Sequence, residues 1–156
     1  MQHYGYKFIY GVNSVNKKKN LGEIPEELLL PLKQKQFKET FKVDENYFDQ
    51  CTINEYKPGA GIPPHTDSHA PFEELLLSVS LFSDIVMTFE NPSNLETFSV
   101  LVPRRSAIVF TKEIRYLWKH SIAARKVDRL SNGLLFRRTR YSLTYRKTKD
   151  EPNCNC

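Results

Sequence analysis

The sequence has 156 residues, of which 40% are hydrophobic, 26% charged and 12% aromatic, and its formal net charge is +5. This composition fits one folded domain with a sizeable core and excludes a disordered chain. The longest strongly apolar run, Leu75–Phe82, is broken by two serines and is too short to span a bilayer. The positive charge permits an anionic partner such as nucleic acid, but does not require one.

The N-terminus and the cysteines bear on the cellular compartment. Met1–Tyr6 contains no apolar segment of the kind found in signal peptides. Cys51 is isolated, and Cys154 and Cys156 are too close in sequence for an unstrained disulfide. We therefore expect a soluble protein of a reducing compartment, the cytoplasm or also the nucleus, with no membrane partner.

In chain order, the first predicted element is a helix over Ile24–Phe37. Pro25 fits the first helical position, and two glutamates follow it where a helix N-terminus favours anions. Pro31 interrupts the pattern, so the segment predicts either one short helix or two fragments. The preceding run Lys17–Lys19 is expected to be an exposed loop with at most a weak RNA contact.

From Cys51 onward, the sequence predicts short β-strands rich in β-branched and aromatic residues. The predicted strands are Cys51–Tyr56, Leu76–Phe82, Ile85–Phe89, Phe98–Val102, Ala107–Thr111, Leu117–Ile122 and Arg140–Lys147. Turn formers such as Asn132-Gly133 separate them. Because the gaps are too short for the helices of a parallel α/β fold, we predict an all-β core with minor helix, arranged as a sandwich or jelly roll.

The last predicted strand has two chemically distinct faces. Arg140, Ser142, Thr144 and Arg146 alternate with aromatic and aliphatic residues, so the polar side chains share one face. That face either points to solvent, as in most amphipathic strands, or lines a barrel interior that holds an anion. Alternation alone does not choose between the two interpretations.

His65 and Asp67 are two residues apart and therefore lie on one side of an extended strand. With His120 from a later β-like run, they supply two imidazoles and one carboxylate, the ligand set of non-heme Fe(II) oxygenases. Arg140 and Arg146 have planar forks suited to an anionic co-substrate. This interpretation requires all five side chains to converge in one pocket.

The order of these residues resembles the AlkB family of Fe(II)- and 2-oxoglutarate-dependent dioxygenases. Five blocks carry the resemblance in the expected order: Asn54–Gly59, His65–Asp67, Pro103–Ser106, Arg115–His120 and Arg140–Arg146. A lone His-x-Asp pair occurs by chance in many proteins, whereas five ordered blocks are specific. The resemblance implies a double-stranded β-helix, or jelly roll, with an N-terminal helical segment. It predicts a single dioxygenase domain over residues 1–156 and leaves open a truncation at both ends.

The resemblance also implies roles for particular residues. The Fe(II) ligands would be His65, Asp67 and His120, with 2-oxoglutarate and O2 as co-substrates. Arg140 is expected at the distal carboxylate of 2-oxoglutarate and Arg146 at its iron end, ~20 Å apart along the strand backbone. Asn54 and Tyr56 would add neutral hydrogen bonds to the co-substrate.

Within the family, the sequence resembles a hydroxylase of a modified wobble uridine in tRNA. There, a histidine two residues beyond the iron carboxylate and cysteines after the last strand hold zinc, and His69, Cys154 and Cys156 occupy matching positions. That relative uses one further cysteine, so a zinc with three protein ligands, no zinc, and a longer chain all stay open. It also carries RNA-recognition and methyltransferase domains, which are the partner domains expected outside these residues.

Other residues have plainer interpretations. Cys51 is expected to be a core thiol, and Tyr116 and Trp118 core aromatics beside His120. His69 taken alone would be a surface histidine, and His3 has no recognisable partner. Six arginines could follow a phosphate backbone, although each alone is more often a solvated charge: Arg104, Arg105, Arg115, Arg125, Arg137 and Arg138.

Three functions stay open on the sequence alone. The first is hydroxylation of a modified wobble uridine in tRNA, which leaves a stable alcohol. The second is oxidative demethylation of alkylated bases in RNA or DNA, which releases formaldehyde. The third is a jelly-roll module that binds zinc and RNA without turnover. The complete set of candidate iron ligands and carboxylate-binding arginines argues against this third function.

Overall fold

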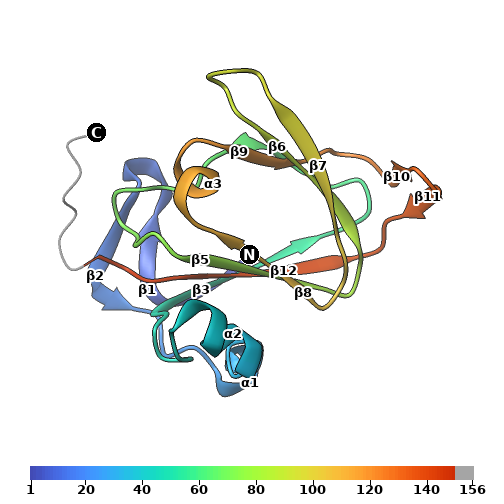
Figure 1. Cartoon of the computed structure of the whole chain (residues 1–156). Coiled ribbons are helices and arrows are strands. Elements are labelled where there is room, and N and C mark those ends of the chain that lie inside the picture. The colour runs from blue at the N-terminus through green and yellow to red at the C-terminus, as the bar shows by residue number, and fades with distance from the viewer. Residues whose placement is uncertain (150–156) are drawn as a thin grey trace.

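Two antiparallel sheets face each other and enclose the interior of the protein in the computed structural model, which describes residues 1–149 (Figure 1). The larger sheet is six-stranded, in the order β2 (Ser14–Asn20), β1 (Gln2–Ile9), β3 (Gln50–Tyr56), β12 (Arg140–Arg146), β5 (Leu76–Leu81) and β8 (Ser106–Phe110). The smaller sheet is four-stranded, in the order β4 (Ile62–His65), β9 (Lys119–Ile122), β6 (Ile85–Glu90) and β7 (Thr97–Val102). The predicted all-β jelly roll is confirmed.

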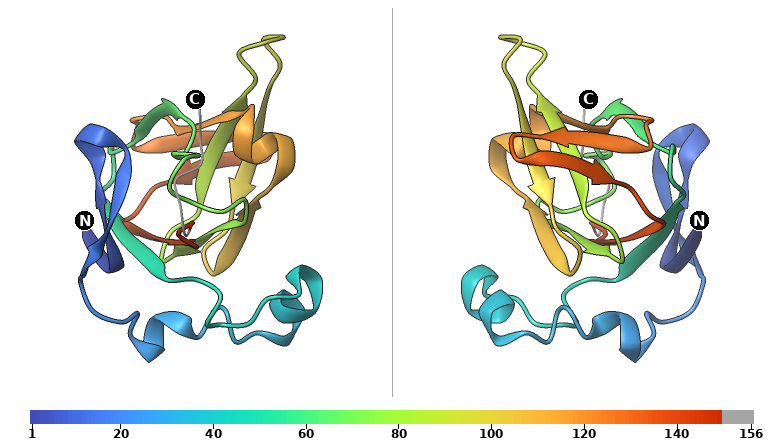
Figure 2. Two further views of the ribbon diagram at one scale, coloured as in Figure 1. Left: turned by 90° about the vertical axis from the view of Figure 1, so that its left-hand side faces the viewer. Right: turned by 90° about the vertical axis from the view of Figure 1, so that its right-hand side faces the viewer.

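Short helices accompany the sheets. The helices are η1 (Tyr10–Val12), α1 (Glu26–Leu29), α2 (Lys35–Phe41) and α3 (Lys112–Tyr116). Pro31 lies between α1 and α2, so the predicted helical segment forms two fragments, and both cover the outer face of the larger sheet (Figures 1 and 2). In the part of the chain that is described, no helix is long and apolar enough to cross a membrane.

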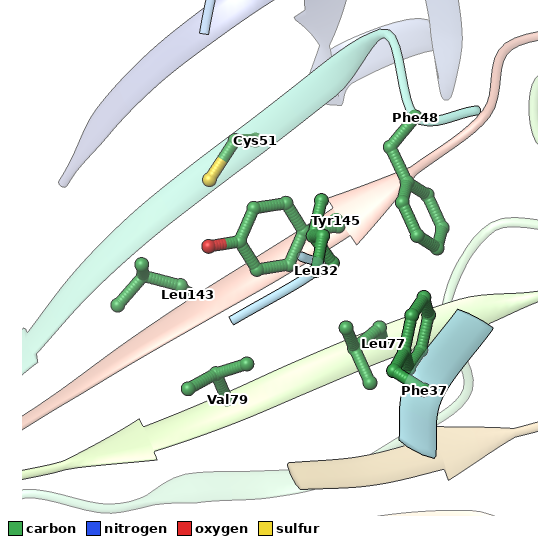
Figure 3. Packing of buried hydrophobic residues seen from close by; sticks show 8 residues of the cluster. All are labelled: Leu32, Phe37, Phe48, Cys51, Leu77, Val79, Leu143 and Tyr145. Carbon is green, nitrogen blue, oxygen red and sulfur yellow. The ribbon is translucent and has the colours of Figure 1, made fainter. Parts of the chain in front are cut away.

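A hydrophobic cluster fills the space between the larger sheet and the helices α1 and α2 (Figure 3). Its buried members are Leu32, Phe37, Phe48, Cys51, Leu77, Val79, Leu143 and Tyr145. Burying one such side chain contributes about 2 kcal/mol to folding. The hydroxyl group of Tyr145 donates a hydrogen bond to the main-chain oxygen of Leu28, which ties α1 to β12. Cys51 is 0% exposed, which confirms the predicted core thiol.

The polar face of β12 points away from this cluster. Its burial decides whether that face is exposed to solvent or lines the interior of the barrel. Arg140, Ser142 and Thr144 are 3%, 5% and 8% exposed. With Arg146 they line a cavity between the sheets. The polar face therefore points into the barrel, because the alternate residues of β12 are already taken up by the cluster beneath the helices.

The hairpin of β1 and β2 is absent from the predicted elements. Lys17–Lys19 are exposed residues of β2, so their prediction as a loop is wrong. β1 pairs with β3 over Gln2–Gly5 and then with β2, with an irregular register after Tyr6. Gly5 has φ +76°, and a Cβ there would come within 1.8 Å of a main-chain oxygen of Asp49. Because β1 changes partner at this point, its sequence has no sustained alternation.

Two more elements differ from the predictions. The segment Leu117–Ile122, predicted as one strand, begins in the turn that follows α3, and only Lys119–Ile122 forms β9. Asn132-Gly133 is a turn as predicted, but the flanking strands β10 (Val127–Leu130) and β11 (Gly133–Phe136) are not among the predicted ones. These two strands form a separate hairpin at one end of the barrel (Figure 2).

A buried ion pair anchors the β10–β11 hairpin. Asp128 is 0% exposed. Nε of Arg137 donates to Oδ2 of Asp128 at 2.6 Å, and Nε of Arg125 donates to Oδ1 at 2.7 Å. Arg137 is itself 6% exposed and also donates to the main-chain oxygen of Ala123. Its interpretation as a solvated or phosphate-contacting charge is therefore wrong.

Loss of the Asp128 carboxylate should destabilise the fold. Asp128→Asn is expected to lower the free energy of unfolding by about 3–5 kcal/mol, because it leaves Arg137 buried without its counter-charge. Urea unfolding at pH 7 measures this, with Arg129→Ala as the control, since Arg129 is exposed on the same strand. The control should change stability by less than about 0.5 kcal/mol. Equal stability of Asp128→Asn and the wild type would contradict the prediction.

The same pair predicts an acid-dependent loss of stability. Burial alone would raise the pKa of Asp128, but the hydrogen bonds from Arg137 and Arg125 outweigh it, so the pKa is lowered. A carboxylate with a lowered folded pKa contributes its full stability above the unfolded value of about 3.9 and loses it as pH falls through the folded pKa. Urea unfolding from pH 6 to pH 2 should show a smaller acid loss for Asp128→Asn than for the wild type.

Candidate active site

A cavity of about 270 Å³ lies between the two sheets, and the predicted site residues converge on it. Its lining includes all seven side chains singled out for iron and co-substrate: Asn54, Tyr56, His65, Asp67, His120, Arg140 and Arg146. They come from β3, β4, β9, β12 and the segment after β4. The spatial convergence that the sequence interpretation requires is therefore present, while the role of each residue stays a prediction.

The two histidines face each other across a strand pair. His65 at the end of β4 is directly opposite His120 on β9 in the antiparallel register, and their ring centroids are 4.3 Å apart. Nδ1 of His65 lies 2.9 Å from the main-chain oxygen of Pro63, which can only accept, so Nδ1 carries the proton. Burial lowers the pKa of His120 to about 4, against the opposing effect of the Asp67 charge. His120 is therefore a neutral imidazole near pH 7.

Asp67 is an ionised carboxylate in the same cavity. Burial alone would raise the pKa of Asp67, but the charge and hydrogen bond of Arg146 outweigh it and lower the pKa to about 2. Nη2 of Arg146 donates to Oδ1 of Asp67 at 3.1 Å. Arg146 also donates to Oγ1 of Thr52 at 3.2 Å, while its Nε is buried without an acceptor among residues 1–149.

The chemistry of these donors fits Fe(II). Two imidazoles and one ionised carboxylate form the set that open non-heme iron sites use. Among the described residues, however, no three histidine, cysteine or acidic side chains are spaced as a ready-made metal cluster. Oδ1 of Asp67 is engaged by Arg146, so a metal would have to share or displace this contact.

Arg140 marks the other end of the polar strand face. Its Nε donates to Oγ of Ser80 at 2.8 Å, and its guanidinium lies 5.5 Å from the centroid of the Tyr56 ring. The β3–β12 register places Arg140 opposite Tyr56 and Ser142 opposite Asn54. Within residues 1–149 no acidic side chain forms an ion pair with Arg140. A buried cation without a counter-charge favours binding of an anion.

The candidate zinc ligands are only partly described. His69 is half-buried, packs edge-to-face on Tyr116 at 5.1 Å, and has a buried Nε2 without a hydrogen-bond partner among residues 1–149. Cys154 and Cys156 lie outside the described residues, so the predicted zinc site stays a prediction. His3 does have a partner, Oγ1 of Thr52 at 3.0 Å from Nδ1, which corrects the interpretation from sequence.

Several residues near the site differ from their interpretation from sequence. Arg115 is 2% exposed and donates to main-chain oxygens of Asp67 and Ser68, so it is neither solvated nor available to phosphate. Tyr116 is 36% exposed rather than a core aromatic, whereas Trp118 is half-buried against the interior cluster as predicted. Four of the six arginines considered for phosphate contact are exposed: Arg104, Arg105, Arg125 and Arg138.

Pocket residues that sequence interpretation missed are of two kinds. Thr52 shares a strand face with Asn54, so its position was available from the period of two. Phe8 and Phe72 also line the cavity, with ring centroids 5.5 Å apart. Nothing in the sequence brings these two aromatics together, because they meet only through the unpredicted β1–β2 hairpin.

Comparison with known proteins gives the chain its context. A family model described as the 2OG-Fe(II) oxygenase superfamily matches residues 2–146. The chain is 40% identical to the tRNA (carboxymethyluridine(34)-5-O)-methyltransferases alkbh8 of Xenopus tropicalis and ALKBH8 of Mus musculus, covering all of this chain and 27% and 25% of those proteins. It is 32% identical to the alkylated DNA repair protein ALKBH8 homolog of Arabidopsis thaliana, covering all of this chain and 51% of that protein. The chain thus spans a quarter to a half of these relatives.

A solved structure supports the fold. The structure of OsALKBH1 matches with a TM-score of 0.66 and 16% sequence identity, over 94% of this chain and 76% of that chain. At this identity the likeness shows the shared architecture alone. The two proteins therefore share the overall fold.

Proposed function

Because the chain belongs to the 2OG-Fe(II) oxygenase superfamily and is thus a dioxygenase domain, we propose that it hydroxylates a modified wobble uridine in tRNA. The observation that carries the proposal is the convergence, on one cavity, of three candidate metal ligands and two arginines that are candidates for binding the co-substrate. A binding module that does not turn over substrate has no need for both a set of iron ligands and a pair of arginines for a co-substrate.

In the proposed site, His65, Asp67 and His120 hold Fe(II). When bound, the metal and 2-oxoglutarate supply the oxidising chemistry, in which O2 converts the co-substrate to succinate and CO2 and a substrate C–H bond to C–OH. The protein contributes two of these ligands in the required protonation state, because the pKa of Asp67 is about 2 and that of His120 about 4. Asp67 and His120 therefore need no change of protonation before a metal binds near pH 7.

The arginines hold the co-substrate at its two ends. The contact between Arg146 and Asp67 supports a role for Arg146 at the metal end, and Arg140 lies at the other end of the same strand face. Ser80 and Tyr56 restrain the Arg140 guanidinium, so its fork is preorganised for a carboxylate. Asn54, on the same face as Tyr56, adds a neutral hydrogen-bonding group.

Two aromatic side chains make part of the cavity lining suitable for a flat substrate. Phe8 and Phe72 supply an aromatic wall, and the exposed Lys17–Lys19 run lies on β2, the strand paired with the Phe8 strand. Aromatic faces beside cations suit a nucleobase with its phosphate backbone. The names of the relatives in frog and mouse refer to carboxymethyluridine at position 34 of tRNA, which supports a wobble-base substrate.

A second candidate function is demethylation of alkylated bases in RNA or DNA. The name of the Arabidopsis relative, an alkylated DNA repair protein homologue, favours it. The same residues would serve both reactions, and the substrate carbon decides the outcome. A hydroxylated carbon bonded to nitrogen collapses and releases formaldehyde, whereas one on a carboxymethyl side chain persists as an alcohol.

Nucleoside mass spectrometry separates these functions. Purified protein is incubated with Fe(II), 2-oxoglutarate and tRNA that carries the unhydroxylated wobble base, or with oligonucleotides that carry methylated bases. The proposal expects a 16-dalton gain on the wobble nucleoside without formaldehyde. Formaldehyde release from the oligonucleotides with unchanged tRNA would establish the demethylase instead. Turnover of neither would contradict both.

The proposal includes a structural zinc and partner domains. His69, with Cys154 and Cys156, would hold zinc, and an RNA-recognition or methyltransferase domain would act together with this one. The support is the unpartnered Nε2 of His69 and the word methyltransferase in the names of relatives of which the chain covers about a quarter.

Elemental analysis tests the zinc site. The wild-type protein is expected to contain about one zinc per chain, and Cys154→Ser to lose most of it, because the substitution removes one of the proposed thiolate ligands. Cys51→Ser is the control, since Cys51 is a buried core thiol. Equal zinc in the wild type and Cys154→Ser would remove the site.

A further inference from the structure

The backbone that carries Asp67 has little regular structure to hold it. β4 ends at His65 and β5 begins only at Leu76, and Asp67 belongs to neither strand. The two histidines, by contrast, are fixed opposite each other by the β4–β9 pairing. A carboxylate that must share a metal with them needs a backbone held equally well.

Arg115 on α3 supplies such a restraint. Its Nη1 donates to the main-chain oxygen of Asp67 at 2.7 Å, and its Nη2 donates to the main-chain oxygen of Ser68 at 2.7 Å. The two ends of one planar fork thus hold two successive carbonyl groups. This fixes both peptide planes that follow the Cα of Asp67 and Ser68, because a guanidinium presents its donors in a rigid geometry.

The burial of Arg115 is not explained by an ion pair. Its side chain is 2% exposed, and among residues 1–149 no carboxylate lies within ion-pair distance of it. Its Nε is buried without an acceptor in the described part of the chain, and its guanidinium lies 5.3 Å from the centroid of the Tyr116 ring. An aliphatic side chain would fill this space without the cost of burying an uncompensated cation. Arg137 is equally buried but has Asp128 as its counter-charge.

We propose that Arg115 is a positioning residue, which holds the Asp67–Ser68 backbone so that the Asp67 carboxylate meets the imidazoles of His65 and His120. The inference rests on the proposed function, because it takes Asp67 as a metal ligand. Arg115 itself touches neither the metal nor the substrate. Replacement of Arg115 leaves all three ligands in the chain but no longer restrains the backbone of Asp67. Metal affinity should therefore fall roughly 10- to 100-fold, as for other residues that support ligands.

Binding of Mn(II), an oxygen-insensitive substitute for Fe(II), tests this without turnover. The dissociation constant is measured from the EPR signal of free Mn(II), and hydrogen exchange is followed in the peptide that covers residues 66–72. Arg115→Gln should weaken Mn(II) binding within the stated range and speed exchange in this peptide. Arg115→Lys should show a smaller loss of affinity, because one ammonium cannot span two carbonyl groups in a fixed plane.

Two controls separate the possible failures. Arg137→Lys alters a buried arginine remote from Asp67 in its contacts, and it should lower thermal stability without changing Mn(II) affinity or exchange in residues 66–72. Asp67→Ala removes the ligand itself and should abolish tight binding.

Unchanged affinity in Arg115→Gln, with affinity lost in Asp67→Ala, overturns the inference but not the proposed function. Unchanged affinity in Asp67→Ala overturns the proposed metal site. If Arg115→Gln does not fold, wild-type affinity in Arg115→Lys overturns the inference. An equal loss of affinity in Arg137→Lys would also overturn it.

Discussion

Replacement of His65 by alanine is expected to abolish 2-oxoglutarate turnover while the jelly roll stays folded. His65 lies at the end of β4 and lines the cavity without belonging to either buried hydrophobic cluster, so its loss removes no core packing. The variant loses one of three proposed metal ligands, and the effect should exceed the roughly 10- to 100-fold loss typical of residues that only support ligands. Asp67→Ala should behave in the same way.

Succinate formation measures this turnover. Thermal unfolding of the same samples shows whether the fold is retained, and the midpoint of His65→Ala should lie within a few degrees of the wild type. Turnover above a tenth of the wild-type rate in a folded His65→Ala protein would exclude His65 as a ligand. A collapse of stability instead would mean that the histidine pair is mainly structural.

Replacement of Arg140 by methionine is expected to raise KM for 2-oxoglutarate with a smaller effect on kcat. Arg140 is 3% exposed, and without it a carboxylate of the co-substrate would be buried without its counter-charge. Removing one partner of such a pair costs about 2–5 kcal/mol, roughly 30-fold to several thousand-fold in affinity. Arg140→Lys should recover part of the loss, because an ammonium restores the charge but not the fork.

Arg138→Met is the matched control for this series. Arg138 is two residues away on the chain but exposed, so its replacement should leave KM for 2-oxoglutarate unchanged. Steady-state kinetics at saturating metal supply both constants for each variant. A KM for Arg140→Met within threefold of the wild-type value would show that the co-substrate does not contact this arginine.

Much of the fold could be predicted because several strands of the two sheets alternate cleanly. β3, β5, β6 and β12 have faces of opposite polarity, and their predicted bounds agree with the structure to within one or two residues. Alternation gives the two faces of β12 but does not say which one points inward. The structure decides it, because the helices cover the face of Leu143.

The elements that sequence interpretation missed depend on long-range contacts. β1 exchanges one partner for another at Gly5, so neither half is long enough to show a period. Arg115 looks like an ordinary basic residue of a short helix, and its acceptors are main-chain oxygens, which leave no trace in the sequence. The pairing of Asp128 with Arg137 likewise depends on a hairpin of which only the turn could be predicted.

The central claim is that one cavity holds a metal between His65, Asp67 and His120 and a 2-oxo acid between that metal and Arg140. Calorimetric titration with 2-oxoglutarate, with and without Mn(II), tests it most directly. The account predicts binding of one equivalent that is strongly metal-dependent and is lost in both Asp67→Ala and Arg140→Met. Binding that is equally tight without metal, or that survives in both variants, would contradict it.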